Sequence, residues 1–151
     1  MNSDSAAKNN GEYWVTTDNS KLDFEIIHNW ITNSYWAEGR SREIMRKVMN
    51  NSLNFGLFIK ESSSEKQIGF ARVVTDYHTF AYLCDVIIDN AYRGRGMGKF
   101  LMDAVMNYPE LKLMKRWLLF TKDAHKLYEK FGFAKDETPE KTMVKRNPDL
   151  R

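Results

Sequence analysis

Apolar residues at helical spacing indicate two amphipathic helices in the first third of the chain. The polar cluster at residues 18–20 offers capping oxygens for the first helix. The apolar positions of that helix are Leu22, Ile26, Ile27, Trp30 and Ile31. Ser41 can cap the second helix, in which Ile44 and Val48 are expected to face inward. A short strand over residues 13–17 is expected before both helices.

Beyond residue 53 the pattern changes to that of β-strands. Residues 55–60, 67–75 and 79–89 are rich in β-forming side chains and are separated by polar turns, which predicts a meander of antiparallel strands. The third run is apolar at both odd and even positions except at Asp85. Such a run is typical of a central strand covered on both faces, so a carboxylate is unexpected there.

A third helix is expected to follow a glycine-rich turn at residues 93–98 and to end before Pro109, since proline cannot continue a helix. The next strand is predicted at residues 116–121. Strand, helix and strand then form a right-handed crossover between parallel neighbours.

The last part of the chain predicts a short helix that ends at Gly132, followed by two more strands at residues 133–135 and 142–145. Together the elements predict an α+β fold. Its central, mostly antiparallel sheet has about six or seven strands, one parallel βαβ crossover, and about four helices distributed over both faces.

Composition limits the organisation to one domain. The 151 residues are 42% hydrophobic and 28% charged, which suits a single globular domain over residues 13–151, whereas the polar residues 1–12 are expected to form a disordered tail. No apolar run is long enough to span a membrane, and the start of the chain lacks the layout of a signal peptide. We therefore expect a cytoplasmic protein without membrane association.

Cysteine content and net charge exclude further classes. Cys84 is the single cysteine, so an internal disulfide is impossible, and the absence of a Cys or His cluster predicts that there is no metal site. The formal net charge of +3 does not by itself indicate a nucleic-acid partner, and an anionic small ligand suits it equally well.

The glycine-rich turn carries the clearest chemical signal. Its glycines alternate with basic residues where a strand enters a helix, which leaves backbone N–H groups exposed in a positive environment and predicts a phosphate site. The spacing does not match a P-loop, because Phe100 follows Lys99 where serine or threonine is required. It does not match a dinucleotide-binding fingerprint either, because Lys99 stands where the third glycine should be.

Two segments carry a resemblance to a known family. Arg93-Gly-Arg-Gly-Met-Gly98 resembles the Arg/Gln-x-x-Gly-x-Gly/Ala signature of the GNAT superfamily, the acetyl-CoA-dependent N-acetyltransferases. Ala124-His-Lys-Leu-Tyr-Glu-Lys-Phe-Gly-Phe133 is similar to the closing motif of that family, a tyrosine-bearing helix that ends at Gly-Phe. The resemblance covers roughly residues 53–146 and implies a GNAT-like fold that uses acetyl-CoA as co-substrate and no metal.

The resemblance also implies which residues contact the cofactor. The pyrophosphate would lie on the amides of the glycine turn, and the pantetheine arm would pair with the preceding strand. The residues implied are Val86, Ile87, Ile88, Arg93, Gly94, Arg95, Gly96, Met97, Gly98 and Lys99. Asp123 stands where many members of the family have an asparagine that touches the cofactor arm. This difference leaves a cofactor contact and helix capping as alternatives for Asp123.

Acetyl transfer to an amine requires a neutral amine, stabilisation of the oxyanion and a proton for the departing thiolate. The resemblance places Tyr128 as the proton donor and a backbone amide of Ile87 or Ile88 at the oxyanion. Asp85 is the candidate base. The structural alternatives are a core role for Tyr128 and an ion pair between Asp85 and a basic residue such as Arg72.

The connection between the two N-terminal helices would form a wall of the acceptor site in this family. There, Tyr35 and Trp36 could hold a cationic amine and Arg40 could pair with a carboxylate, or the aromatic rings could only staple the two helices together. The predicted function is N-acetylation of a primary amine on a small molecule or peptide. The alternative is a non-catalytic acyl-CoA-binding or partner-binding domain, and a homodimer is possible in either case.

Overall fold

Six strands form one sheet in the order β1-β2-β3-β4-β5-β6 in the computed structural model, which describes residues 8–149. All neighbouring strands are antiparallel except β5 and β6, which are parallel. The strands are β1 (Lys8–Asn9), β2 (Tyr13–Thr16), β3 (Leu53–Lys60), β4 (Glu65–Thr75), β5 (Ala81–Ile88) and β6 (Trp117–Leu118). The predicted α+β fold with a mostly antiparallel sheet is confirmed.

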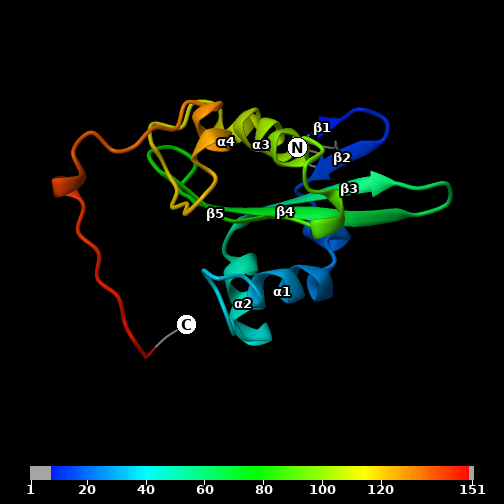
Figure 1. The fold of residues 1–151 in the computed structure, drawn as a ribbon, viewed down its shortest axis with the longest axis horizontal. Coiled ribbons are helices and arrows are strands. Elements are labelled where there is room, and N and C mark those ends of the chain that lie inside the picture. The colour runs from blue at the N-terminus through cyan, green and yellow to red at the C-terminus, as the bar shows by residue number, and fades with distance from the viewer. Residues whose placement is uncertain (1–7, 150–151) are drawn as a thin grey trace.

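Helices cover both faces of this sheet, as the sequence predicts (Figure 1). One face carries α1 (Phe24–Thr32) and α2 (Arg42–Asn50), and the other carries α3 (Met97–Met106) and α4 (His125–Glu129). Four short 3-10 turns complete the described elements: η1 (Asn19–Lys21), η2 (Asn90–Tyr92), η3 (Pro109–Leu111) and η4 (Pro139–Lys141).

Each face of the sheet has its own apolar core. The larger core lies between the sheet and α3, with Phe55, Leu57, Leu101 and Val105 fully buried. The smaller core packs α1 and α2 against β4, where Phe70 is fully buried. Asp85 lies in β5, and the glycine-rich turn leads from the end of β5 into α3.

The starts of the helices differ in part from the sequence prediction. Asp18 caps the short turn η1, whereas Asp23 caps α1 by accepting a hydrogen bond from Ile26 N–H at 3.1 Å. A 3-10 turn thus comes between the polar cluster at residues 18–20 and the helix it was expected to cap. Ser41 does cap α2, since its Oγ accepts from Ile44 N–H at 3.2 Å.

The residues of α2 that face the core follow the predicted ones by one position. Met45 and Met49 are buried in the smaller core, whereas Ile44 is exposed and Val48 is half-buried. Both pairs have i, i+4 spacing, so periodicity alone could not distinguish them. The two methionines are flexible enough to fill the irregular space above Phe70.

Part of the segment predicted to be a disordered tail forms a strand. Lys8 and Asn9 form strand β1 and pair with Val15 and Trp14, so the expectation of disorder is wrong for this part of residues 1–12. The Lys8 ammonium contacts the Asp103 carboxylate at 3.0 Å and lies 4.2 Å from the centroid of the Phe100 ring. Residues 1–7, which the same prediction covers, lie outside the described residues.

The C-terminal strands are the main departure from the prediction. Neither residues 133–135 nor residues 142–145 form a strand, and η4 lies between them. The strand expected at residues 116–121 is reduced to Trp117–Leu118, which pairs with Ala81 and Tyr82. β6 therefore has no strand on its outer edge within residues 8–149.

The orientation of α2 can be tested by a pair of truncations. Met45→Ala removes a fully buried side chain, so we expect it to lower the free energy of unfolding by about 2–5 kcal/mol. Ile44→Ala removes an exposed side chain one position earlier and should change stability by about 0.5 kcal/mol or less. Urea unfolding of both variants measures the difference. The reverse order would mean that the predicted face was right.

Candidate active site

Strands β5 and β6 diverge soon after they begin. Their pairing is confined to Ala81 with Trp117 and Tyr82 with Leu118. From Leu83 to Ile88, β5 continues to pair with β4 on its other side but has no strand partner on the β6 side within the described residues. The main-chain groups on this side are available to an extended ligand. Val86, Ile87 and Ile88 lie in this part of β5.

The glycine-rich turn lies directly beyond the open edge of β5. Gly94 and Gly96 have φ values of 76° and 77°, a left-handed conformation that other residues rarely adopt. A Cβ atom at either position would meet no atom within 4 Å, so the turn presents bare backbone to the surface. Gly96 is the N-cap of α3, and the first amides of a helix have no partner inside the helix. The arrangement suits an anion.

The basic residues of the turn surround this helix start. Arg93, Arg95 and Lys99 are exposed, so each can reach an anionic ligand. Arg93 Nε donates to the Ile88 carbonyl at 3.0 Å, which ties the turn to the end of β5. The Arg95 guanidinium lies 5.4 Å from the centroid of the Tyr92 ring. The one buried residue of the turn is Met97, which packs in the larger core.

Gly98 brings the two motifs of the sequence together. A Cβ atom at this position would lie 3.3 Å from Leu127 Cδ2 of α4, so the glycine allows the first turn of α3 to approach α4 closely. Phe133 N–H donates to the Tyr128 carbonyl at 3.3 Å and Gly132 N–H donates to the Glu129 carbonyl at 3.2 Å, which closes α4 in a Schellman motif. Gly132, with a φ of 87°, is the residue that permits this closure.

Tyr128 combines a buried ring with an accessible hydroxyl. Burial, together with the smaller electrostatic effects of Tyr35 and Asp123, raises the pKa of Tyr128 to about 12. Among the described residues, the fully buried side-chain polar atoms without a partner are Trp14 Nε1 and Asn54 Oδ1. The Tyr128 hydroxyl has no hydrogen bond to residues 8–149 and is not one of these atoms, so it opens onto accessible space. The hydroxyl can therefore bond water or a ligand, and a core role for the ring is compatible with either.

Asp85 is held by three donors from two other elements. Its Oδ1 accepts from Trp36 Nε1 at 2.9 Å, and its Oδ2 accepts from Arg40 Nη1 and from Arg72 Nε, both at 2.8 Å. The backbone at Asp85 has a φ of 52° and lies where the register between β4 and β5 shifts, so the side chain turns out of the strand pattern. The Asp85 carboxylate therefore connects β5 to the loop between α1 and α2.

The charge on Asp85 follows from these contacts. Burial acts to raise its pKa, but the attraction of Arg72 and Arg40 and the hydrogen bonds outweigh burial, and the pKa lies below its ordinary value. Of the two expectations from the sequence, the ion pair with Arg72 is the one that the structure contains. Arg40, expected to pair with a carboxylate of the acceptor, is already paired with Asp85.

The loop between α1 and α2 presents two aromatic rings beside this network. Tyr35 and Trp36 are 60% and 42% exposed and form a T-shaped pair with centroids 5.1 Å apart. The Lys122 ammonium lies 5.5 Å from the centroid of the Tyr35 ring, so the loop reaches the segment before α4. Trp36 acts less as a staple between helices than as a partner of Asp85, because its indole nitrogen bonds that carboxylate.

Backbone contacts fix where this loop turns. His28 Nε2 lies 2.8 Å from the Arg40 carbonyl oxygen, and Gly39 N–H donates to the Thr32 carbonyl at 3.0 Å. Ser34 Oγ donates to the Ile31 carbonyl at 2.6 Å. The contact from Lys122 and the anchor at His28 were missed in the sequence, since residues distant along the chain carry no periodic signal.

Asp123 lies at the start of α4 but does not cap it. The Ala124 N–H is bonded instead by Thr121 Oγ1 at 3.0 Å. Asp123 is exposed, and its charge is felt at Tyr128. The capping alternative is therefore wrong, and Asp123 remains a candidate contact for a ligand near Tyr128.

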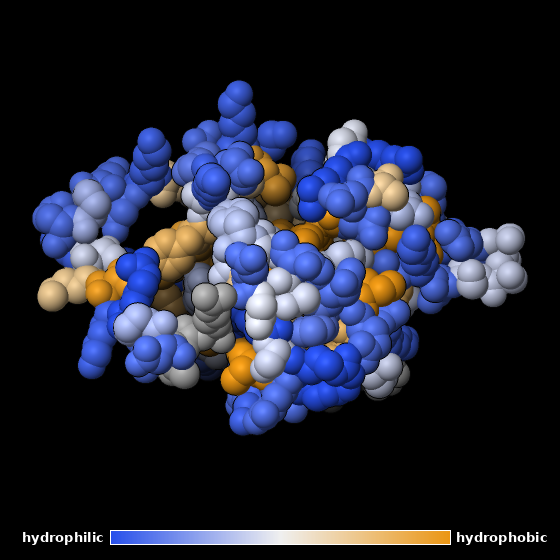
Figure 2. All heavy atoms as spheres, turned by 60° about the horizontal axis from the view of Figure 1, so that its bottom comes forward, coloured by the Kyte–Doolittle hydropathy of each residue, from blue (hydrophilic) through white to orange (hydrophobic). Residues whose placement is uncertain are grey.

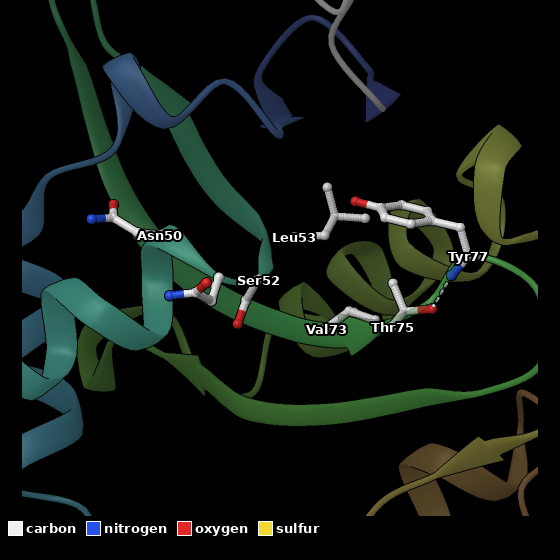
Figure 3. Close-up of a pocket in the computed structure, with 7 residues that line it drawn as sticks. Asn50, Ser52, Leu53, Val73, Thr75 and Tyr77 are labelled. Carbon is white, nitrogen blue, oxygen red and sulfur yellow. Dashed lines mark hydrogen bonds between the residues drawn. The ribbon is translucent and has the colours of Figure 1, made fainter.

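Two cavities flank the sheet. The smaller, of about 200 Å³, lies between the end of α2 and strands β3 and β4, where Asn50, Ser52 and Thr75 line it (Figure 3). It holds no acidic or basic side chain. The larger, of about 640 Å³, lies beside β6 and α4 and has Thr121, His125 and Tyr128 in its wall.

Over residues 8–149 no group of three or more His, Cys, Asp or Glu side chains could hold a metal ion. None of the helices described between these limits has the length and apolar character needed to cross a membrane.

The known proteins to which this chain is similar are described as acetyltransferases. A family model described as an acetyltransferase (GNAT) domain matches residues 53–135, which include the open strand, the glycine-rich turn and Tyr128. A protein of Gibberella zeae assigned to the acetyltransferases is 29% identical over 146 residues, with 83% of this chain and 81% of that protein covered. An uncharacterised N-acetyltransferase of Pyropia yezoensis is 28% identical over 109 residues, which cover 72% of this chain and 63% of that protein.

A solved structure is similar over almost the whole chain. It is a protein of Xanthomonas campestris pv. campestris assigned to the GNAT family of acetyltransferases. The two chains are 41% identical and superpose with a TM-score of 0.84, which covers 91% of this chain and 95% of the other.

The network around Asp85 can be tested through stability. Asp85→Asn keeps the shape and the tolerance for positive φ but leaves Arg40 and Arg72 without a counter-charge, so we expect a loss of about 3–5 kcal/mol at pH 7. Since the pKa of Asp85 is lower in the folded chain than in the unfolded one, its contribution is complete above the ordinary value of about 3.9 and is lost as the pH falls through the folded value.

Urea unfolding of wild type and variant between pH 7 and pH 3 should therefore show a gap that narrows below about pH 4. Glu25→Gln is the matched control, because it breaks the exposed pair between Glu25 and Arg42 and should have little effect. A gap that persists unchanged at low pH would mean that the carboxylate charge is not what Asp85 contributes.

Proposed function

Because this chain belongs to the GNAT family of acetyltransferases and is an acyltransferase by that membership, we propose that it transfers an acetyl group from acetyl-CoA to a primary amine. The observation that carries the proposal is the geometry at the open edge of β5. An extended edge, an anion-binding helix start and an accessible phenol hydroxyl meet there, as transfer from a long phosphorylated thioester requires.

The residues of this region fit the cofactor. The amides and basic side chains of residues 93–99 would hold the pyrophosphate, since bare backbone and positive charge meet there. Val86, Ile87 and Ile88 would pair with the pantetheine arm along the side of β5 that β6 leaves open. The bound thioester supplies the acetyl group and the thiolate leaving group. We place Asp123 as a further contact near the sulfur end, because its charge reaches Tyr128.

The cofactor part of the proposal is tested by binding alone. CoA is expected to raise the melting temperature of the wild type, because a ligand that binds only the folded chain stabilises it. In Arg95→Ala/Lys99→Ala, CoA affinity should fall by about tenfold at low salt, because two positive charges beside the phosphates are lost. Calorimetry gives the dissociation constants.

Lys112→Ala, which removes an exposed lysine outside the turn, is the control and should bind CoA like the wild type. Absence of any stabilisation at millimolar CoA would exclude the proposed cofactor.

The chemistry we propose is direct attack by the amine. A neutral amine nitrogen bonds to the thioester carbon, the oxyanion is stabilised by the N–H of Ile87 or Ile88, and the C–S bond then breaks. The proton lost by the nitrogen balances the proton gained by the sulfur. Burial raises the pKa of Cys84 to about 11, so this thiol is protonated near neutral pH and is a poor covalent intermediate.

Tyr128 is the residue we place at the departing sulfur. With a pKa of about 12, its phenol stays protonated at every physiological pH and can donate to the developing thiolate. Asp85 is not assigned the role of base, because both its oxygens already accept hydrogen bonds from Trp36, Arg40 and Arg72. We place it instead as the residue that positions Trp36 at the acceptor side.

We place the acceptor site at the loop between α1 and α2, which carries Trp36. Tyr35 and Trp36 offer exposed aromatic faces to an amine-bearing small molecule or peptide. Arg40 shapes this wall through Asp85 rather than by direct contact. A non-catalytic acyl-CoA-binding domain would show the same cofactor affinity, so thiol release from acetyl-CoA in a screen of primary amines separates the two functions.

The role of Tyr128 is tested in that screen with Tyr128→Phe. We expect kcat to fall by about tenfold or more while CoA affinity is retained, because only the hydroxyl is removed. In the wild type, kcat/KM should rise with pH as the acceptor amine loses its proton and should show no decline from Tyr128 up to about pH 10. An unchanged kcat in the variant would remove Tyr128 from the mechanism.

A further inference from the structure

The face of β5 that points toward α1 and α2 carries side chains that the proposed mechanism does not use. Leu83 packs in the larger core, so its neighbours Tyr82 and Cys84 point to the opposite face of the sheet. The register shift near Asp85 keeps the Asp85 side chain on that opposite face, because Val86 again packs against the larger core. Tyr82 is half-buried there, on the same side of β5 as the Asp85 carboxylate.

The described helices leave this part of the sheet uncovered on that face. Figure 1 shows α1 and α2 below the middle of the sheet and no helix below its end near α4. Figure 2 brings this face of the molecule forward and shows a hollow at the same end, with apolar side chains at its margin. Phe120 is 66% exposed, and its ring meets the Tyr82 ring edge-on with centroids 5.9 Å apart. The accessible surface next to β5 is therefore aromatic.

Contacts between three segments close a ring around this end of β5. Phe120 contacts Tyr82, and two positions after Phe120 the Lys122 ammonium lies 5.5 Å from the centroid of the Tyr35 ring. Tyr35 in turn packs edge-on against Trp36, whose indole nitrogen is bonded back to β5. Four aromatic side chains, three of them exposed, are thus joined by contacts around the open edge of the strand.

This aromatic ring of residues lies at the end of β5 to which the acetyl group would point. With the pyrophosphate at residues 93–99 and the pantetheine arm along residues 86–88, the thioester end is directed back toward the start of the strand. Tyr82 is the last residue of β5 that pairs with β6, so the two strands separate directly after it. Phe120 and Tyr128 both line the larger cavity. An amine held among these rings would therefore lie close to the thioester carbon.

The charges of this region favour an acceptor with a single amine. The buried Asp85 carboxylate is paired with two guanidinium groups, which leaves the base of the site with an excess positive charge. A second ammonium group on the acceptor would be repelled there. The exposed acids of the same loops, Glu38 and Asp123, are accompanied by the exposed Lys122. A single ammonium group can bind an exposed aromatic face before it loses its proton.

We propose that the acceptor is a primary amine joined by a short chain to a flat aromatic body, and that Tyr82 and Phe120 select it. The body packs among Trp36, Tyr82 and Phe120, and the amine extends to the thioester. The nitrogen bonds to the acetyl carbon, the C–S bond breaks, and the proton lost by the nitrogen balances the proton gained by the sulfur. This inference rests on the proposed acetyl transfer and adds the class of acceptor to it.

The class of acceptor is tested with matched amines. Thiol release from acetyl-CoA is measured with phenethylamine and with cyclohexylethylamine, which has the same length but no flat ring, at equal concentrations of neutral amine. We expect kcat/KM to be about fivefold or more higher for phenethylamine, because only its ring can pair with aromatic side chains. Spermidine and β-alanine should both be poorer acceptors than phenethylamine. Equal rates for the two matched amines, or a preference for spermidine or β-alanine, would overturn the acceptor class and leave the transfer itself in place.

The selecting residues are tested by removing their rings. Phe120→Leu changes an exposed position, so the fold should be kept, and we expect KM for phenethylamine to rise about fivefold with kcat and CoA affinity nearly unchanged. Tyr82→Leu should change KM in the same direction. Tyr77→Leu, which removes an exposed aromatic side chain at the smaller cavity, is the matched control and should resemble the wild type. An unchanged KM in Phe120→Leu would contradict the assignment.

Calorimetry separates this inference from the acetyl transfer on which it rests. Phenethylamine is titrated into the chain saturated with CoA, which carries no acetyl group and therefore allows no turnover. We expect binding to the wild type and about fivefold weaker binding to Phe120→Leu. Binding without thiol release from acetyl-CoA would contradict the transfer and support the aromatic site. Absence of binding at millimolar phenethylamine would overturn the inference.

Discussion

The candidate site depends on the ion pairs and hydrogen bonds of the buried Asp85 carboxylate. This carboxylate is buried on the strand that faces the proposed cofactor, and it is bonded by an arginine from β4 and by an arginine and a tryptophan from the loop between α1 and α2. Two positive charges on one buried anion are tolerable only because the donors are close and directional. These bonds tie β5 to the loop between α1 and α2, the two parts that we propose to hold the cofactor and the acceptor.

The second constraint is close approach of backbone at the start of α3. Gly94 and Gly96 take left-handed conformations that bare the helix start, and Gly98 lets α4 come within van der Waals contact of that turn. The Schellman closure at Gly132 ends α4, and Leu127 of this helix packs against Gly98. This packing brings together the two motifs, which lie about 30 residues apart in the sequence.

The third feature is the unfinished edge of the sheet. β5 and β6 pair for only two residues, which opens β5 for an extended ligand on one side and leaves β6 short on the other. The same divergence thus leaves main-chain groups of both β5 and β6 without a strand partner within the described residues, and those of β5 are the ones that we propose for the cofactor.

Sequence alone determined the order of the central elements over residues 53–106. Strands that bury one face have apolar residues at every second position, and helices that bury one stripe have them about every 3.6 positions. It also located the glycine-rich turn before α3, since glycines at positive φ beside a helix start carry a local signature. Whether Ile44 or Met45 faced inward, and which basic residues pair with Asp85, were decided only by tertiary structure. Both depend on which distant residues lie opposite, and neither Arg40 nor Phe70 is placed by any local pattern. The failed strands at the C-terminus have the same cause, because a strand needs a neighbour and the chain by itself places none beside residues 142–145.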